Sequence, residues 1–320
     1  MRVLITGGAG FIGSHLAERH LQMGDEVDVI DNFATGSIEN IKHLEENPKF
    51  TYTVDDVRNV KAMGPLIDEC DIIYHLAAAV GVDYIIDNFL QSLMTNIRGT
   101  EVILELANEK KKKVILASTS EIYGKKNGHV PFREDSDRIL GPTTVIRWHY
   151  STSKAVDELF ALAYWREKRL PCVIFRPFNV IGPRQTEAAG VVPRFVKNAL
   201  LGHPISIYGD GEQSRCWTYI DDALDGLVEL AMSDRAVGEI FNLGSQFGST
   251  IKELAYKIKG MTDSDSTIDL VPYDQVWNKG DYEDLIYRVP DLAKIRDVVG
   301  YDPKVDLDEA LARIISHYAR

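Results

Sequence analysis

The sequence predicts an α/β protein: a Rossmann-type doubly wound parallel sheet with a smaller mixed α/β lobe from the C-terminal half. Short apolar runs recur through the first part of the chain, helical stretches separate them, and this regular pattern breaks up after about residue 176. Strands that alternate with helices form parallel sheets through right-handed crossovers. We therefore expect one domain over residues 1–176 and a substrate lobe over 177–320.

The apolar runs are the predicted strands. Because they are apolar rather than alternating with polar residues, they suit strands buried on both faces of a sheet. Long helices are expected over 92–110 and from about 148 to 168. The predicted strands are RVLIT (2–6), EVDVI (26–30), DIIYHL (71–76), KVILAS (113–118) and PCVIFR (171–176).

Prolines and glycines divide the second half into loops, short helices and short strands. Asp221 to Met232 nevertheless has strong helical spacing. Helical spacing of apolar residues indicates a packed helix. We therefore expect a segment of about 218–245 to return to the main domain.

Composition excludes several classes of protein. A hydrophobic content of 45% and a charged content of 26% are typical of a soluble globular protein. The net charge of -12 argues against nucleic acid as a partner, because phosphate binding needs a basic surface. No apolar run approaches the roughly 18 residues that a membrane span needs, so no membrane association is expected.

The cysteines and histidines give no metal-binding pattern. Cys70, Cys172 and Cys216 are far apart and form no CxxC, and the histidines include no HExxH pair. The chain begins directly with the strand-like MRVLIT, which leaves no room for a signal peptide. We expect a cytoplasmic protein with neither a disulfide framework nor a metal.

A glycine array follows the first predicted strand. In GGAGFIG, the three glycines Gly7, Gly10 and Gly13 permit a tight turn and a close approach of backbone to a pyrophosphate. The helix that begins at Phe11 and Ile12 offers free N–H groups to the phosphates. A tight turn that binds no ligand is the alternative.

An acidic residue ends the second strand. Asp31, eighteen residues after Gly13, can accept hydrogen bonds from the adenosine ribose, with Asn32 beside it. A carboxylate there repels a 2′-phosphate, which favours NAD over NADP. Taken alone, Asp31 could merely begin a turn. Strand, glycine turn, helix, strand and acid together predict NAD binding.

Later strand ends complete the predicted cofactor site. Asp56 and Val57 follow a further expected strand, the third along the chain and not among the five runs above, where an acid can reach the adenine amino group; a solvated loop acid is the alternative. HLAAA (75–79) offers small residues against which a cofactor can lie. The further expected contacts are Leu76, Ala77, Ala78 and Asn96.

The stretch IRWHYSTSK (146–154) places Tyr150 four positions before Lys154. On a helix this spacing puts the phenol and the ammonium on one face. The pair is either an ordinary surface contact or a base with the cation that tunes it, and the spacing alone does not decide.

Seven motifs carry a resemblance. TGGAGFIGSHL, HLAA, TNIRGT, STSEIYG, YSTSK, RPFNVIGPR and YGDGEQSR occur in this order over most of the chain. They resemble the extended short-chain dehydrogenase/reductase family, whose members modify nucleotide sugars with NAD. The resemblance implies that Tyr150 and Lys154 are the catalytic pair and that Thr119 hydrogen-bonds the reacting oxygen. A strand-end hydroxyl bonded to backbone is the alternative for Thr119.

The chemistry accounts for these residue types. Oxidation of a sugar hydroxyl needs a base, and the tyrosine pKa of about 10 must fall by roughly 3 units, which corresponds to about 4 kcal/mol. The ammonium of Lys154 and the positive nicotinamide have the sign that lowers it.

Within the family, STSEIYG, ILGPTTVIRWHYSTSK, FRPFNVIGPR and QSRCWTYIDD are similar to the UDP-glucuronic acid decarboxylases. This resemblance implies oxidation at C4, loss of the β-keto carboxylate as CO2, and release of UDP-xylose or a 4-keto pentose. It implies that Ser120 and Glu121 orient the carboxylate and return a proton to C5. Arg215 would hold the carboxylate or the diphosphate.

Other activities stay open at this point. The Gln-x-Arg arginine also occurs in 4-epimerases, Ser-Glu before IYG also resembles GDP-mannose 4,6-dehydratases, and STSK differs from the DEGK of many UDP-xylose synthases. A non-catalytic NAD sensor is a further alternative, but it has no need of Thr119, Tyr150 and Lys154 together.

The UDP-sugar is expected to contact the second half of the chain, where arginine suits bidentate phosphate binding. A structural role is the alternative for Arg184 and Arg288. The helices 92–110 and 148–168 are the pair that relatives use for a four-helix bundle, so we expect a homodimer. The expected substrate contacts are Asn179, Arg184, Val192 (in VVPRF), Arg215 and Arg288.

Overall fold

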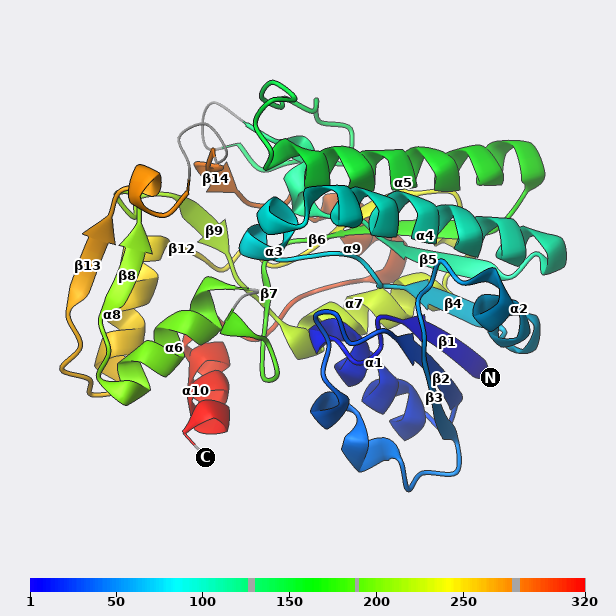
Figure 1. The fold of residues 1–320 in the computed structure, drawn as a ribbon, viewed down its shortest axis with the longest axis horizontal. Helices are drawn as coiled ribbons and strands as arrows, with labels where there is room; N and C mark the ends of the chain where they lie inside the picture. The colour runs from blue at the N-terminus through cyan, green and yellow to red at the C-terminus, as the bar shows by residue number, and fades with distance from the viewer. Residues whose placement is uncertain (126–129, 188–189, 278–282, 320) are drawn as a thin grey trace.

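A parallel sheet forms the centre of the molecule (Figure 1). The computed structural model describes residues 1–125, 130–187, 190–277 and 283–319. Within these ranges the main sheet has seven strands in the order β11-β6-β5-β4-β1-β2-β3. They are β1 (Arg2–Thr6), β2 (Glu26–Asp31), β3 (Phe50–Val54), β4 (Ile72–His75), β5 (Lys113–Ala117), β6 (Cys172–Pro177) and β11 (Ile240–Leu243).

The strand order confirms the predicted doubly wound fold. β1 lies between β2 and β4 with all pairs parallel, so that Val3 is opposite both Val27 and Ile72. From β1 the chain builds the sheet first in one direction, through β2 and β3, and then in the other, through β4, β5 and β6. In such sheets ligands bind at the carboxyl ends of the strands where this direction changes, here β1 and β4. The glycine turn, Asp31 and Thr119 follow the carboxyl ends of three strands of this sheet.

Helices cover both faces of the sheet, and residues along β1 alternate between the two cores. Val3 and Ile5 belong to the core that includes α1 and α7, whereas Leu4 belongs to the core beneath α2, α4 and α5. α4 and α5 run side by side across the same face (Figure 1). The bounds are α1 (Phe11–Gln22), α2 (Val60–Glu69), α3 (Val82–Asp87), α4 (Phe89–Lys110), α5 (Trp148–Lys168), α7 (Ile220–Met232) and α9 (Ala293–Val299).

Smaller sheets and helices of the second half form the other side of the molecule (Figure 1). β8 pairs with β13, β9 lies between β12 and β14, and β7 pairs with β10. The bounds are β7 (Val180–Ile181), α6 (Val191–Leu201), β8 (Ile205–Tyr208), β9 (Ser214–Cys216), β10 (Thr218–Tyr219), β12 (Gly248–Thr250), α8 (Ile251–Met261), β13 (Ile268–Val271), β14 (Tyr287–Arg288) and α10 (Leu307–Tyr318). Short 3-10 helices are η1 (Ile38–Asn40), η2 (Lys42–Leu44), η3 (Ser120–Tyr123), η5 (Asp234–Ala236) and η6 (Tyr273–Gln275).

β11 comes from the second half of the chain but pairs with β6 of the main sheet, with Phe241 opposite Phe175. The division of the chain near residue 176 stays a prediction. Cys70, Cys172 and Cys216 are free and buried. Over the described ranges, no helix is both long and apolar enough to cross a membrane.

Candidate active site

The glycine turn between β1 and α1 has no room for side chains. Gly7 adopts a positive φ of 70°, and a Cβ on it would lie 2.8 Å from the backbone nitrogen of Ala77. A Cβ on Gly13 would overlap the carbonyl oxygen of Gly7. α1 begins at Phe11, and its N-cap Gly10 supplies no side-chain cap. The first N–H groups of the helix, including those of Ile12 and Gly13, therefore remain available to an anion such as a pyrophosphate.

Asp31 is held rigidly at the end of β2. Its Oδ2 accepts the Ala9 N–H at 2.9 Å and its Oδ1 accepts the Phe33 N–H at 2.8 Å. Burial raises the pKa of Asp31, and these two backbone hydrogen bonds oppose the shift. Each carboxylate oxygen keeps a lone pair that can accept a ribose hydroxyl.

Asp56 is engaged within the protein. Arg58 donates to it from Nε at 2.8 Å and from Nη2 at 2.6 Å, and Asn32 donates from Nδ2 at 3.2 Å. The hydrogen bond from Arg58 is the main reason why the pKa of Asp56 is lowered. Val57 is buried beside Gly99 of α4. Asp56 thus lies just after the carboxyl end of β3, as expected, but both of its carboxylate oxygens already accept hydrogen bonds from Arg58.

The segment after β4 is tied to the helices above it. Asn96 of α4 accepts the Ala79 N–H at 2.8 Å and donates to Ser153 of α5 at 3.1 Å. Asn96 therefore connects the loop, α4 and α5. Leu76, Ala77 and Ala78 are half-buried in this loop.

Tyr150 lies in the first turn of α5, beside the side chain of Thr119, which follows β5. Thr119 Oγ1 also accepts the Glu121 N–H at 3.1 Å. Burial is the main cause of a raised pKa of Tyr150, and the charge of Glu121 raises it further, whereas the neighbouring Thr119 side chain acts to lower it. The protein's own groups thus shift this pKa upward, opposite to the lowering that we expected from sequence.

Lys154 does not face Tyr150 alone. Its Nζ lies 2.6 Å from Oδ2 of Asp157, one helical turn along α5, and both side chains are buried. The carboxylate offsets the positive charge of Lys154. We expected Lys154 to lower the pKa of Tyr150. The charge of Asp157 acts to raise that pKa, and this explains part of the disagreement.

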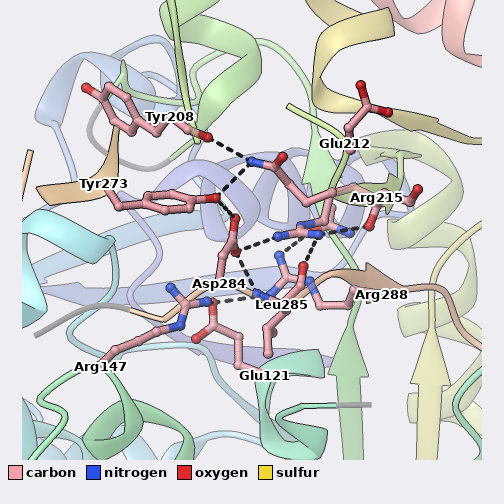
Figure 2. Close-up of polar contacts among 12 residues, drawn as sticks. Glu121, Arg147, Tyr208, Glu212, Arg215, Tyr273, Asp284, Leu285 and Arg288 are labelled. Atoms are coloured by element: carbon pink, nitrogen blue, oxygen red, sulfur yellow. Dashed lines mark hydrogen bonds and ion pairs between the residues drawn. The ribbon is translucent and has the colours of Figure 1, made fainter. Parts of the chain in front are cut away.

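Glu121 lies between two arginines (Figure 2). Its Oε1 is 3.2 Å from Arg288 Nη1 and 3.5 Å from Arg147 Nη2. Burial acts to raise the pKa of Glu121, but the charges of Arg147 and Arg288 outweigh it and hold the pKa below its ordinary value. Glu121 is therefore a carboxylate at neutral pH.

A second ion pair stands beside the first. Arg215 Nη2 lies 2.7 Å from Asp284 Oδ1, and Arg215 Nη1 donates to the Leu285 carbonyl at 2.5 Å. Tyr273 donates to Asp284 Oδ2 at 2.8 Å, and Gln213 donates to Tyr273 at 3.3 Å (Figure 2). Burial would raise the pKa of Asp284, but Arg215 and Arg147 hold it below its usual range.

These residues line a cavity of about 250 Å³ between the main sheet and the second lobe. Among the described lining residues, four guanidinium groups (Arg147, Arg194, Arg215 and Arg288) stand against three carboxylates (Glu121, Glu187 and Asp284), and this excess of positive charge suits an anionic ligand. Arg194 also lines the cavity and lies over the ring of Tyr208, 4.3 Å from its centroid. The lining includes Glu121, Arg147, Asn179, Val192, Arg215, Asp284 and Arg288.

The structure brings most predicted substrate residues together. Asn179 accepts a hydrogen bond from Arg288, and Val192 is buried at the start of α6. Arg184 is not among the described residues that line the cavity: it contacts Ser14 and Glu18 of α1. The structural alternative considered for Arg184 thus matches its position.

Among the described residues, the cavity lining also leaves out Thr119, Ser120, Tyr150 and Lys154. Ser120 is buried at the start of η3. Thr119 and Tyr150 are linked to the cavity through Glu121, whose N–H bonds Thr119 and whose carboxylate reaches the arginines.

Sequence reasoning missed Arg147, Asp157 and Asp284. Arg147 stands three residues before Tyr150 and Asp157 three after Lys154, so helical spacing signals both. Asp284 gives no such local signal, because its role depends on contacts with Arg215 and Tyr273. Among the described residues, no group of three or more His, Cys, Asp or Glu side chains is placed to hold a metal ion.

The chain is similar in sequence and structure to enzymes that act on nucleotide sugars. The profile of the GDP-mannose 4,6 dehydratase family matches residues 4–314. The UDP-N-acetyl-alpha-D-glucosaminuronate decarboxylase of Bacillus cytotoxicus is 41% identical over 99% of this chain and 97% of its own length. UDP-glucuronic acid decarboxylase 1 of Arabidopsis thaliana is 38% identical over 99% of this chain and 70% of its own length. The structure of a UDP-glucuronic acid 4-epimerase from Bacillus cereus, in complex with UDP-glucuronic acid and NAD, is 30% identical with a TM-score of 0.89, covering 99% of both chains.

Proposed function

Because this chain belongs to the GDP-mannose 4,6 dehydratase family of extended short-chain dehydrogenases/reductases, we propose that it is an NAD-dependent decarboxylase of UDP-glucuronic acid that acts through a 4-keto intermediate. The observation that carries the proposal is Glu121, held as a carboxylate between Arg147 and Arg288 beside Thr119. Both named decarboxylase relatives and the uronate epimerase support a uronic acid substrate.

The turn after β1 fits NAD. The glycines exclude side chains where a pyrophosphate would approach, and α1 offers uncapped N–H groups. Asp31 would bind the adenosine ribose and disfavour a 2′-phosphate. When bound, NAD supplies the acceptor for the hydride from C4 of the sugar and can later return that hydride.

Tyr150 and Thr119 would act on the C4 hydroxyl. Tyr150 takes the hydroxyl proton as general base, while Thr119 hydrogen-bonds the same oxygen. Burial and the charge of Glu121 raise the pKa of Tyr150, so the proposal requires a further positive charge to favour the phenolate. The positive charge of the bound oxidised cofactor has the sign that is needed to lower it.

Loss of CO2 then needs orientation more than acid chemistry. Once C4 is a ketone, the C5 carboxylate is β to it, and the electron pair of the broken C–C bond passes into an enolate. C5 then takes up a proton. Because Glu121 is ionised, we assign it to hold Arg288 and Arg147 in place for the anionic groups of the substrate. Arg215 and Asn179 complete this anion-binding side of the cavity.

The experiment is incubation of the purified protein with NAD and UDP-glucuronic acid, followed by NMR of the nucleotide sugars. UDP-xylose or a 4-keto pentose would support the proposal. UDP-galacturonate with C6 retained would replace it by a 4-epimerase. In a parallel incubation with an NDP-hexose, formation of a 4-keto-6-deoxy sugar would replace it by a dehydratase.

A second substrate deserves the same assay. The relative at 41% identity is named for the 2-acetamido uronate, so UDP-N-acetylglucosaminuronic acid should be tested in parallel. The ratio of kcat/KM for the two uronates assigns the C2 substituent. Binding of NAD with no turnover of either uronate, or of any other nucleotide sugar, would favour an NAD sensor.

A homodimer through α4 and α5 is part of the proposal. Leu90 is 73% exposed, Met94 50% and Leu159 63%, so these helices present apolar side chains outward. Pairing with a second copy would bury them. Sedimentation at micromolar concentration tests this, and a monomer would contradict it. A cytoplasmic location also remains a prediction.

A further inference from the structure

A buried polar chain runs behind Lys154. Its first link is the 2.6 Å ion pair between Lys154 Nζ and Asp157 Oδ2. The side chain of Lys154 is 3% exposed and that of Asp157 is 0% exposed. A buried pair of this kind fixes both side chains, because neither charge has water as an alternative partner.

The chain continues into the sheet. The side chain of Thr100 of α4 lies beside the Asp157 carboxylate and acts to lower its pKa, but among the described residues Asp157 Oδ1 has no hydrogen-bond partner. Thr100 Oγ1 lies 3.2 Å from His75 Nε2, and His75 Nδ1 lies 2.8 Å from Thr6 Oγ1. Thr6 precedes Gly7 of the glycine turn and also accepts the Ala77 N–H at 3.2 Å. Hydrogen bonds thus join the predicted cofactor turn to Thr100, which lies beside Asp157.

The direction of the hydrogen bonds follows from chemistry. A carboxylate only accepts, so a Thr100 hydroxyl turned toward Asp157 leaves its oxygen to accept from His75 Nε2–H. Burial, with the nearby charge of Lys154, lowers the pKa of His75 to about 3, so this ring is neutral. A neutral ring with its proton on Nε2 accepts at Nδ1, and Thr6 therefore donates to it.

We propose that Asp157 is a positioning residue, which holds the Lys154 ammonium in one place relative to Tyr150 and the cofactor. The proposal rests on the function proposed above, in which Lys154 serves Tyr150. It also explains why a carboxylate stands three residues after this lysine, within a helix that packs against α4.

The test is a double-mutant cycle of Asp157→Ala and Lys154→Met, with Asp157→Asn as the conservative variant. Three quantities are measured: the rate of NADH formation in a single turnover, the dissociation constant of NAD by calorimetry, and the thermal midpoint. Asp157→Ala should slow oxidation about a hundredfold, the order of loss that follows a misplaced catalytic group. Asp157→Asn keeps a hydrogen-bond acceptor and should recover part of the rate.

The double variant separates positioning from a general structural role. If Asp157 acts through Lys154, the double variant should match Lys154→Met in rate and NAD affinity within about twofold. It should also melt above Lys154→Met, because that single variant leaves Asp157 buried without its counter-ion. Losses that multiply in the double variant, or an Asp157→Ala protein that oxidises and binds NAD like the wild type, would overturn the proposal.

These outcomes remain distinct from failure of the proposed function. A wild type that turns over no uronate would reject the decarboxylase. NAD affinity and thermal midpoints would still show whether Asp157 and Lys154 are coupled. If Asp157→Ala does not fold, the same cycle runs with Asp157→Asn.

Discussion

Arg147 Nη2 lies 3.5 Å from Glu121 Oε1, and this contact joins the start of α5 to the short helix after β5. Arg147 is the N-cap of α5, three residues before Tyr150. The same helix start therefore carries both the proposed base and a cation that keeps Glu121 ionised (Figure 2). Changes at Glu121 should affect the anion site first and Tyr150 second.

Glu121→Gln should abolish most decarboxylation while leaving NAD binding intact. The amide cannot neutralise Arg147 and Arg288, so their positions and the orientation of the substrate carboxylate should change. We expect a loss of about a hundredfold in kcat, comparable to the loss of one positioned polar group. The measurement is CO2 release from labelled UDP-glucuronic acid. Glu239→Gln, which breaks the exposed pair with Lys294, is the matched control and should change little. A Glu121→Gln enzyme with the wild-type rate would remove Glu121 from the mechanism.

Tyr150→Phe should lose catalysis without losing the fold. Removal of a general base costs about 10²–10⁴ in rate. NADH formation, followed by absorbance in a single turnover, is the measurement, and calorimetry of NAD binding is its control. Thr119→Val should give a smaller loss, because the base remains. Oxidation by Tyr150→Phe at an undiminished rate would mean that another group takes the C4 proton.

The main sheet was predictable from sequence because its strands are short apolar runs set off by helices. All five predicted strands lie in the sheet, as the runs at 2–6 and 113–118 show by their near coincidence with β1 and β5. The helix predicted from about 148 to 168 is α5, Trp148–Lys168. These elements are specified locally, by periodicity and glycine placement.

The anion site was harder to predict, because its geometry depends on long-range pairs. Glu121 contacts Arg288, 167 residues away in sequence, and Arg215 contacts Asp284 across 69 residues. Family resemblance indicated Glu121 and Arg215 but not their partners. Local spacing gave Tyr150 and Lys154, yet it did not show that Asp157 would neutralise the lysine. The Glu121–Arg288 and Arg215–Asp284 pairings are set by packing of the two lobes rather than by any local pattern.

Asp31→Asn should relax the choice of dinucleotide. The amide has a single oxygen, so it can accept a hydrogen bond from only one of the two backbone groups, the Ala9 N–H or the Phe33 N–H. The uncharged amide also no longer repels a 2′-phosphate. We expect the preference for NAD over NADP to fall by about tenfold, equivalent to about 1.4 kcal/mol. Dissociation constants for both dinucleotides check this, with Asp269→Asn on the exposed side of β13 as the control. An unchanged ratio would show that Asp31 only shapes the turn.

Asp284→Asn should make the free energy of unfolding depend less on pH in the acid range. At neutral pH the substitution leaves Arg215 buried without its counter-ion, which should lower the free energy of unfolding by about 3 kcal/mol. The folded-state pKa of Asp284 is lowered, so its stabilisation is present above the unfolded-state pKa of about 3.9 and is lost as the pH falls through the folded-state value.

The difference in unfolding free energy between wild type and Asp284→Asn should therefore be constant from about pH 6 to 5 and shrink below about pH 4. Urea denaturation followed by tryptophan fluorescence measures it at each pH. Asp31 and Asp222, whose pKa values are raised, titrate in both proteins, so their effects cancel in the difference. A difference that grows in acid would mean that Asp284 is protonated more readily in the folded protein than in the unfolded chain, contrary to its pairing with Arg215.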